Sequence, residues 1–216
     1  MAAITAYVDG FNLYFGMHNK YGRRYQWLDV VELVRRTRRD DQVSVVRYFS
    51  AIVKNEPAAA QNQQDYLAAL AAHNGQLVDV RLGRFKDRTI KPCRRCSKPY
   101  QCGCPRDYKS YEEKETDVAL GAMMVADAAQ GIGDATMLIS ADTDLVPALA
   151  AVRLVAPTRP IYLALPPGNS GFSGRWTAIG DVRPFFINES ALRNAQLPPT
   201  VTDAANRVFH RPAKWA

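Results

Sequence analysis

The chain has 216 residues, of which 47% are hydrophobic and 23% charged, so its composition is that of a globular domain and excludes wholesale disorder. Lys and Arg outnumber Asp and Glu by 28 to 21, giving a formal net charge of +7, which favours a polyanionic partner such as nucleic acid. No apolar run of about 18 residues occurs, and the N-terminus lacks the basic start and apolar stretch of a secretory signal, so we expect a cytoplasmic protein without a membrane span.

Extended apolar runs alternate with helix-like stretches along the chain. We expect strands at 4–8, 43–53, 77–82, 136–140, 160–165 and 181–187, and helices at 30–39, 58–73, 114–130, 145–155 and 189–197. This alternation predicts an α/β fold with a doubly wound, mostly parallel sheet flanked by helices. Residues 166–176 are expected to form a flexible loop, whose glycine-rich part either closes over a substrate or only connects. Residues 198–216 are polar and are expected to form a loose C-terminal tail.

Residues 84–113 interrupt this rhythm and are interpreted as an insertion, because they hold four cysteines, three prolines and few apolar side chains. Residues 81–114 contain eleven Lys and Arg against four Asp and Glu, so this segment carries the whole surplus of positive charge. Such a concentrated positive charge either attracts a polyanion or is simply a solvated face.

Several carboxylates follow strands whose carboxyl ends we expect at one edge of the sheet, where open parallel sheets bind ligands. Asp9 follows the strand 4–8, with Asn12 three residues later, and Asp142 and Asp144 follow the strand 136–140. Each has an ordinary structural interpretation as well. Asp9 with Gly10 can form a turn, Asn12 can cap a helix at 13–17, and Asp144 can cap the next helix.

Asp117 is a fourth candidate, because on a helical period it shares a face with Leu120, Gly121 and Met124. A surface pair with Lys114 is the alternative. Three or four carboxylates around one point repel one another, and a divalent cation relieves this repulsion. Oxygen ligands select Mg²⁺ or Mn²⁺, which would activate water for attack on a phosphodiester.

These segments resemble a known family. Asp9-Gly10-Phe11-Asn12, Lys114-Glu115-Thr116-Asp117, and Ser140-Ala141-Asp142-Thr143-Asp144 followed by Leu145-Val146-Pro147 resemble, in order and spacing, the NYN domain family of PIN-like, LabA-type relatives of metal-dependent ribonucleases. The resemblance covers about residues 3–197. It implies a PIN-like fold over residues 1–197 and a metal-dependent endoribonuclease that cleaves RNA with Mg²⁺ or Mn²⁺. By motif, it implies that Asp9, Asp117, Asp142 and Asp144 bind the metal, and we add Asn12 to the catalytic candidates.

Two residues depart from the family pattern. Ala141 stands where the family usually has glycine, and Glu115 adds an acid where a small residue is common. Neither change removes a presumed metal ligand.

All four cysteines, Cys93, Cys96, Cys102 and Cys104, lie within twelve residues. Four thiols this close in a reducing compartment favour a structural zinc site, with free thiols or a redox role as the alternatives. A zinc-stapled arm would present basic side chains to RNA phosphates, although the zinc could equally serve only as a staple. We expect the RNA-binding residues to be Arg94, Arg95, Lys98, Arg106, Lys109 and Lys114.

Two other functions compete with the nuclease. A haloacid dehalogenase-type phosphatase would use Asp142-Thr143-Asp144, but its nucleophile follows the first strand of its fold and this motif lies late in the chain. A catalytically silent RNA-binding regulatory module of the same fold is the main alternative. The sequence is compatible with a homo-oligomer or with a protein partner as well.

Overall fold

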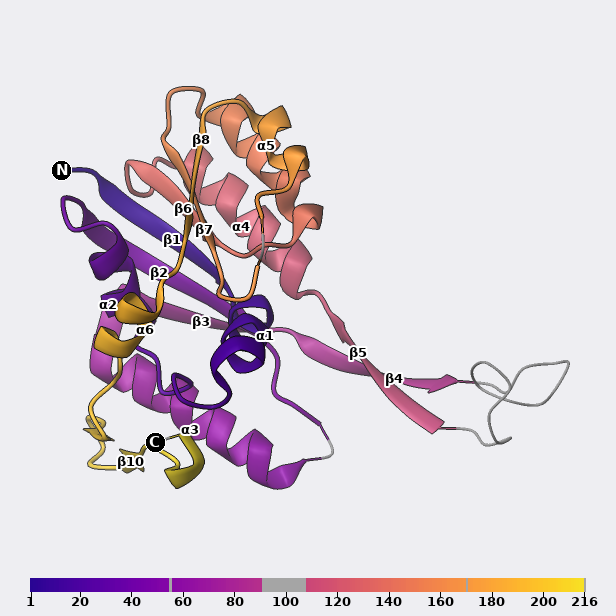
Figure 1. Ribbon diagram of the computed structural model, residues 1–216, viewed down its shortest axis with the longest axis vertical. Helices are drawn as coiled ribbons and strands as arrows, with labels where there is room; N and C mark the ends of the chain where they lie inside the picture. Colours follow the sequence, from indigo (N-terminus) through magenta and orange to yellow (C-terminus); the bar gives the residue numbers. More distant parts are fainter. Residues whose placement is uncertain (55, 91–107, 170, 216) are drawn as a thin grey trace, which may run out of the picture.

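The structure, a computed structural model, describes residues 1–54, 56–90, 108–169 and 171–215 (Figure 1). Its centre is a six-stranded sheet in the order β3-β2-β1-β6-β7-β8, in which every neighbouring pair is parallel. The predicted parallel sheet is therefore confirmed. Its strands are β1 (Ala3–Asp9), β2 (Gln42–Ser50), β3 (Val78–Leu82), β6 (Ala135–Ile139), β7 (Ile161–Leu165) and β8 (Val182–Phe186).

Helices cover both faces of the sheet, because successive side chains of each strand point to opposite sides. Ile4 and Val8 of β1 belong to one hydrophobic core and Tyr7 to the other. The first core packs under α1 (Gly10–Tyr21), α2 (Val30–Thr37), α3 (Pro57–Asn74) and α6 (Glu189–Asn194), and the second under α4 (Thr116–Ala129) and α5 (Val146–Val155). Within the described ranges, no helix is long and apolar enough to cross a membrane.

The strand order places a switch point between β1 and β6. From β1 the chain adds β2 and β3 on one side, and later adds β6, β7 and β8 on the other. The loops after β1 and β6 therefore diverge to opposite faces of the sheet and leave a crevice at their carboxyl ends, where open α/β sheets bind ligands.

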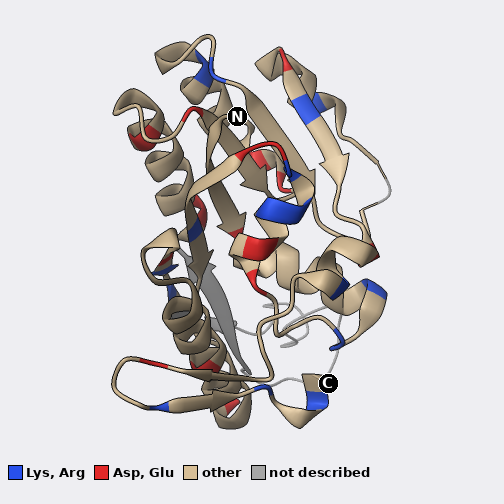
Figure 2. Ribbon diagram, turned by 90° about the vertical axis from the view of Figure 1, so that its left-hand side faces the viewer, with Lys and Arg blue, Asp and Glu red and all other residues tan. Residues whose placement is uncertain are grey.

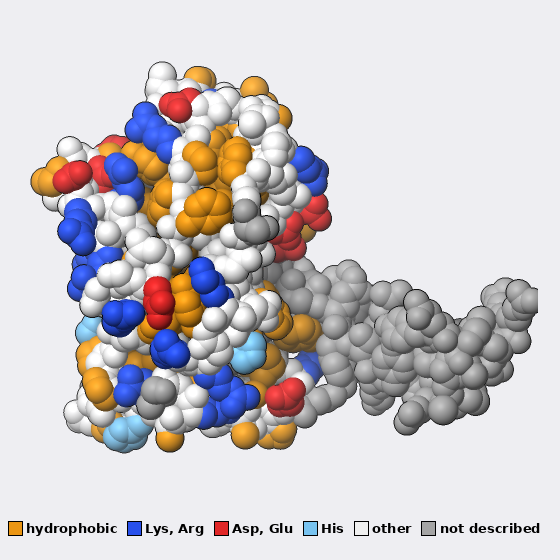
Figure 3. Space-filling view, in the orientation of Figure 1, with side chains coloured by type: hydrophobic (Ala, Val, Ile, Leu, Met, Phe, Trp, Pro, Cys, Tyr) orange, Lys and Arg blue, Asp and Glu red, His pale blue; other side chains and the backbone are white. Residues whose placement is uncertain are grey.

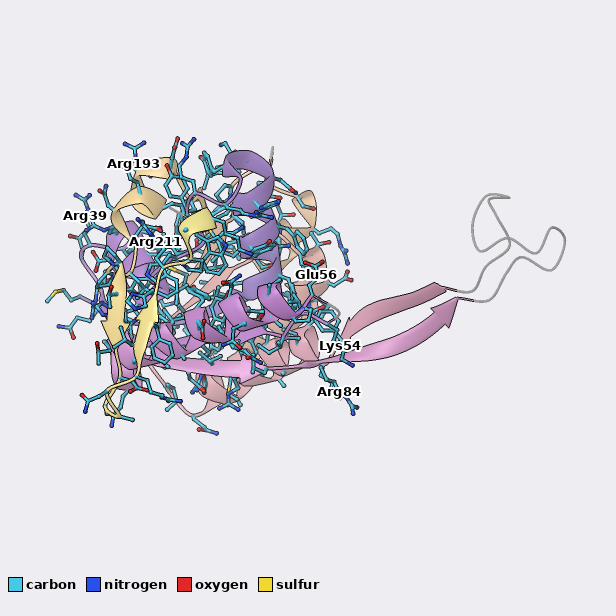
Figure 4. The ribbon with its side chains drawn as sticks, turned by 90° about the horizontal axis from the view of Figure 1, so that it is seen from below. Arg39, Lys54, Glu56, Arg84, Arg193 and Arg211 are labelled. Atoms are coloured by element: carbon cyan, nitrogen blue, oxygen red, sulfur yellow. The ribbon has the colours of Figure 1, made fainter. Side chains whose placement is uncertain are left out.

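A hairpin that the sequence pattern did not predict leaves the body between β3 and α4. β4 (Arg84–Ile90) and β5 (Tyr108–Lys114) pair with each other in antiparallel fashion and form a separate two-stranded sheet, which projects from the body in Figure 1. Its base is tied to the body by an Arg84–Glu115 ion pair of 2.6 Å and by Lys54, whose Nζ donates to the carbonyl oxygen of Phe85. Figure 4 shows Lys54, Glu56 and Arg84 grouped at this corner.

The predicted zinc site lies outside the described residues, since Cys93, Cys96, Cys102 and Cys104 all fall between 91 and 107. The same holds for four of the six predicted RNA-binding residues, Arg94, Arg95, Lys98 and Arg106. The other two, Lys109 and Lys114, belong to β5.

The C-terminal segment packs against the body, whereas the sequence predicts a loose tail. β9 (Thr200–Thr202) pairs with β10 (Val208–His210), and a short 3-10 turn follows, η4 (Ala213–Trp215). Trp215 is 8% exposed and contacts the rings of Trp27 and Tyr66. Trp27 in turn donates its indole N–H to the Pro198 carbonyl oxygen at 2.7 Å. The buried hydrophobic residues of the segment, Val201 and Trp215, lie far apart in sequence, so the segment shows no periodic apolar pattern.

A buried ionic network joins β1, β2 and α4. Asp127, on α4, accepts hydrogen bonds from Nε and Nη2 of Arg47 on β2 and from the hydroxyl of Tyr7 on β1. Arg47 also pairs with Asp79 of β3 at 2.7 Å. Burial, followed by the hydrogen bond to Asp127, raises the pKa of Tyr7 far above its ordinary value, so its hydroxyl stays protonated and donates. The network therefore fixes α4 against the strands that carry the crevice.

A second carboxylate ties the start of β1 to the turn before β2. Asp41 accepts the backbone N–H of Ala2 at 2.9 Å and pairs with Arg38. Its side chain is 8% exposed. The backbone hydrogen bond and the neighbouring guanidinium hold the pKa of Asp41 below its ordinary value.

Candidate functional site

A pocket of about 610 Å³ occupies the crevice at the carboxyl ends of the strands. Figure 1 shows α1 at this end of β1, beside the base of the hairpin. Its wall is formed by the end of β1, by the loops after β2, β6 and β7, by β4, by one side of α1 and by the first turn of α4. Its lining residues are Asp9, Phe11, Asn12, Phe15, Gly16, Asn19, Val53, Phe85, Asp117, Asp142, Pro167, Gly168 and Asn169.

Asp9 is the buried carboxylate of this pocket. It ends β1 and is the N-cap of α1, where its Oδ1 accepts the backbone N–H of Asn12 at 2.9 Å. Its Oδ2 accepts the hydroxyl of Ser140 at 3.0 Å. The residue is 5% exposed, and burial, reinforced by the nearby charge of Asp142, raises its pKa above the ordinary value. A buried, partly repelled carboxylate is a group that a cation would stabilise.

Asp142 faces Asp9 from the other side of the switch point. Ser140 links the two acids, because its hydroxyl donates to Asp9 and accepts the backbone N–H of Asp142 at 3.0 Å. Asp142 is the N-cap of the 3-10 turn η2 (Thr143–Leu145) and accepts the backbone N–H of Asp144. The loops after β1 and β6 are thus locked together around two carboxylates.

Asn12 is not the N-cap of the helix, which was one of its two possible roles in the sequence. The helix begins earlier, at Gly10, with Asp9 as its cap. The side-chain oxygen of Asn12 accepts the backbone N–H of Ala141 at 2.9 Å. Asn12 therefore lines the pocket and at the same time holds the loop that presents Asp142.

The other two acids are placed differently. Asp117 lies in the first turn of α4 and lines the same pocket. The sequence predicts that it shares a buried face with Leu120 and Met124, but Asp117 is exposed and the buried apolar face of α4 that contains these two residues begins at Leu120. Asp144 does not line the pocket. Its side chain is 83% exposed and lies 3.7 Å from Nη1 of Arg175. The pocket thus contains Asp9, Asp117, Asp142 and Asn12, and the expected convergence of all four acids does not occur.

The donor set decides which kind of cation fits. Among the residues that the structure describes, no three His, Cys, Asp or Glu side chains are close enough to hold one ion together. The described part of the chain therefore contains no closed carboxylate site. Mg²⁺, however, usually takes one or two protein carboxylates and completes its shell with waters and ligand phosphates. The pair Asp9 and Asp142, with Asp117 also in the pocket lining, fits that open kind of site.

Aromatic side chains and a loop complete the wall. The sequence interpretation missed the aromatic residues as site components, whereas it considered the loop 166–176 as a segment that closes over a substrate or only connects. Phe11 lies between Phe15 and Phe85, with ring centroids 6.5 and 5.8 Å away. The spacing of Phe11 and Phe15, four residues apart on one helix face, was the available signal. The loop after β7 closes on α1 at Gly16, where a Cβ would lie 2.6 Å from the carbonyl oxygen of Pro167. Glycine at this position is what allows the close approach.

Charged residues of both signs are distributed over the body. Acidic and basic residues are interspersed over the body (Figure 2), and the Lys and Arg side chains in Figure 3 are spread over the face rather than gathered in one patch. Arg175, which lies near Asp144, also donates to the hydroxyl of Thr143 at 2.8 Å. The positive surplus of the sequence falls mainly on residues 81–114.

Comparisons with known proteins give few relatives. No family model matches the chain. It is 25% identical, over 236 aligned positions, to a Pseudomonas putida protein named 6-hydroxy-3-succinoylpyridine 3-monooxygenase HspA, and the match covers 97% of this chain and 74% of that protein. Among solved structures, it is similar to a Vibrio parahaemolyticus protein of unknown function, with a TM-score of 0.54 and 18% identity. That match covers 87% of this chain and 94% of the other and supports the α/β fold alone.

The named relative corrects one prediction. A monooxygenase is an oxidoreductase, whereas the predicted enzyme, a PIN-like metal-dependent endoribonuclease, is a hydrolase of phosphodiester bonds. The assignment of this chain as such an endoribonuclease is therefore wrong. The motifs that suggested it are three short segments, and they specify where acids stand on the sheet rather than which bond is broken.

Proposed function

We propose that the pocket at the switch point binds a divalent cation, Mg²⁺ or Mn²⁺, and that the chain uses this site to bind RNA through a backbone phosphate. The observation that carries the proposal is the pair of carboxylates Asp9 and Asp142, linked by Ser140 on either side of the switch point. RNA hydrolysis is not part of the proposal.

The residues of the chain have defined parts in such a site. Asp9 and Asp142 would hold the cation, which when bound would neutralise them and attract a phosphate oxygen. Ser140 and Asn12 keep the two acid-bearing loops in place. The positive end of α1 also points into the pocket, since its first backbone N–H groups lie beside Asp9, and it favours an anionic ligand.

The aromatic wall favours a ligand that also carries planar rings. Phe15 is 53% exposed, and Phe11 and Phe85 are in edge contact beside it. Exposed aromatic rings next to a phosphate-binding group are typical of surfaces that bind single-stranded nucleic acid, because bases stack on them. The net charge of +7 acts in the same direction.

Some finer assignments belong to the same proposal. We propose that the fold is PIN-like and of the NYN type, that Cys93, Cys96, Cys102 and Cys104 bind structural zinc, and that the protein is cytoplasmic. Their support is the sequence pattern described above. On this proposal the basic residues between 94 and 114 add contacts to RNA phosphates.

The relative's name suggests a second candidate ligand. A substituted pyridine with an acidic side chain shares with a nucleotide an anionic oxygen group attached to a planar nitrogen ring. A pocket of about 610 Å³ with three phenylalanines in its wall is within the size range of small-molecule sites. The same cation would then bind a carboxylate in place of a phosphate.

The test is RNA binding with and without the cation. Fluorescence anisotropy of a labelled single-stranded RNA is measured with Mn²⁺ and with a chelator, for the wild type, Asp142→Asn and Asp181→Asn. Asp181 is a matched control, because its side chain is 75% exposed and it is not part of the pocket wall. We expect chelation and Asp142→Asn each to weaken binding at least about tenfold, or about 1.4 kcal/mol, and Asp181→Asn to have no effect.

Equal RNA affinity in chelator and in Mn²⁺ would contradict the proposal. Displacement of the RNA by 6-hydroxy-3-succinoylpyridine, or Mn²⁺-dependent binding of that compound without any RNA binding, would favour the second candidate.

A further inference from the structure

A second cavity lies behind the candidate site. It has a volume of about 330 Å³ and is enclosed by α1, β2, α3 and the C-terminal turn η4. Figure 4 shows α1, α3 and the C-terminal segment side by side, with Glu56 at one end of α3. Only Phe11, Phe15 and Val53 are shared with the first pocket, so the helix α1 separates the two.

The floor of this cavity is apolar and aromatic. Leu13 and Met17 of α1 are 1% and 5% exposed, and Tyr48, Tyr66 and Trp215 are 7%, 7% and 8% exposed. The three aromatic rings meet at angles of 76° and 77° with centroids 6.2 to 6.3 Å apart, which is edge-to-face packing. An apolar floor of aromatic rings favours a ligand whose buried part is itself an aromatic ring.

The hydrogen-bonding groups of the floor are neutral. Tyr66 donates to the Leu28 carbonyl oxygen at 2.9 Å. Burial raises the pKa of both Tyr48 and Tyr66 well above the ordinary value, so both phenols stay protonated. Gln63, also in the lining, donates its side-chain N–H to the hydroxyl of Ser50 at 3.2 Å. A charged group would therefore not be stabilised at the bottom of the cavity.

The charged residues of the lining lie at the mouth of the cavity. Arg23 and Lys214 are both exposed there, and neither forms an ion pair with a residue of the described chain. Glu56 is the one acid in the lining. Two cations against one acid favour an anionic group on the ligand, placed at the mouth while its apolar part is buried.

We propose that this cavity is a binding site for a small planar aromatic carboxylate, with its ring between α1 and Trp215 and its carboxylate at Arg23 and Lys214. The volume lies at the lower end of the range of small-molecule sites, about 300–1,000 Å³, which fits a ligand with one or two rings. The site is independent of the cation site, because no residue proposed to hold the cation lines it.

The test uses benzoate and indole-3-acetate as probes, with benzamide as the uncharged analogue, in isothermal titration calorimetry and ligand-observed NMR. We expect one site per chain for the carboxylates and at least about tenfold weaker binding of benzamide, since the mouth charges have no partner on it. Lys214→Gln and Arg23→Gln should weaken carboxylate binding by a similar factor. Arg39→Gln is the matched control, because Arg39 is exposed and is not part of this cavity's wall.

Two further variants locate the site. Ala59→Phe places a ring into the cavity from α3 and should abolish binding, while thermal unfolding checks that the variant is folded. Asp142→Asn and a chelator should leave carboxylate binding unchanged, which separates this site from the cation site. The inference is overturned if neither carboxylate binds the wild type, if benzamide binds as well as benzoate, or if Asp142→Asn removes the binding.

Discussion

Replacing Asp127 with alanine is expected to cost about 3–4 kcal/mol of unfolding free energy. The Asp127 carboxylate is 4% exposed and accepts two hydrogen bonds from Arg47 and one from Tyr7. Removing one partner of a buried ion pair costs about 3–5 kcal/mol, because the other charge stays buried. The lower part of that range applies here, since the Arg47 side chain is 15% exposed and keeps its pair with Asp79.

Urea unfolding followed by circular dichroism measures this loss directly. For a chain of this length, 1 kcal/mol shifts Tm by about 2–4 °C, so Tm should fall by roughly 6–16 °C. Tyr7→Phe removes only the hydroxyl donor and should cost about 1 kcal/mol. The double variant Asp127→Leu with Arg47→Met should cost less than Asp127→Ala, because it leaves no buried charge unpaired. A loss below about 1 kcal/mol for Asp127→Ala would refute the reasoning that this network fixes α4 on the sheet.

Three further predictions concern the pocket loop, acid stability and the cation. Gly16→Ala should lower the unfolding free energy by about 1–3 kcal/mol, because its Cβ would overlap the Pro167 carbonyl oxygen. Gly174→Ala, which has open space, should change it by less than about 0.5 kcal/mol in the same urea titration. The low pKa of Asp41 means that its carboxylate stabilises the fold above about pH 4 and that this contribution is lost as the pH falls through the lower folded-state pKa. Stability of Asp41→Asn should therefore decline less steeply on acidification than that of the wild type, and parallel pH profiles would exclude this linkage. Mn²⁺ at 100 times its dissociation constant should raise the unfolding free energy of the wild type by about 2.7 kcal/mol and that of Asp142→Asn far less, as a thermal-shift titration will show.

Much of the sheet was predictable because its strands are continuous apolar runs. The expected strands at 4–8, 136–140 and 160–165 match β1, β6 and β7 closely, since all three are buried on both faces. The hairpin of β4 and β5 was not predicted, because its residues are mostly charged or polar and the pairing partners are separated by the segment 91–107. Most of α1 was missed as well, since its aromatic and polar residues follow no clear helical stripe.

The site was predictable as an edge of the sheet but not as a set of contacts. The motif around Asp142 correctly places an acid after β6, and strand order brings it to Asp9. The sequence could not show that Asp144, two residues later, turns outward with the 3-10 turn η2. It also could not show that Ser140 and Asn12 link the two acid-bearing loops, because both bonds depend on pairs more than 120 residues apart.

The hairpin leaves and re-enters the body at neighbouring points, since Arg84 is paired with Lys114 across its base. The structure of the body therefore does not restrict the number of residues between Arg84 and Lys114. Doubling the length of such a closed segment costs only about 0.6 kcal/mol of chain entropy. Evolution can lengthen, trim or replace the part of this arm beyond Phe85, which lines the pocket, while the sheet, α4 and the pocket keep their geometry. For the same reason, the hairpin beyond the Phe85–Glu113 pair is the natural point at which to graft a foreign domain or to substitute a short turn.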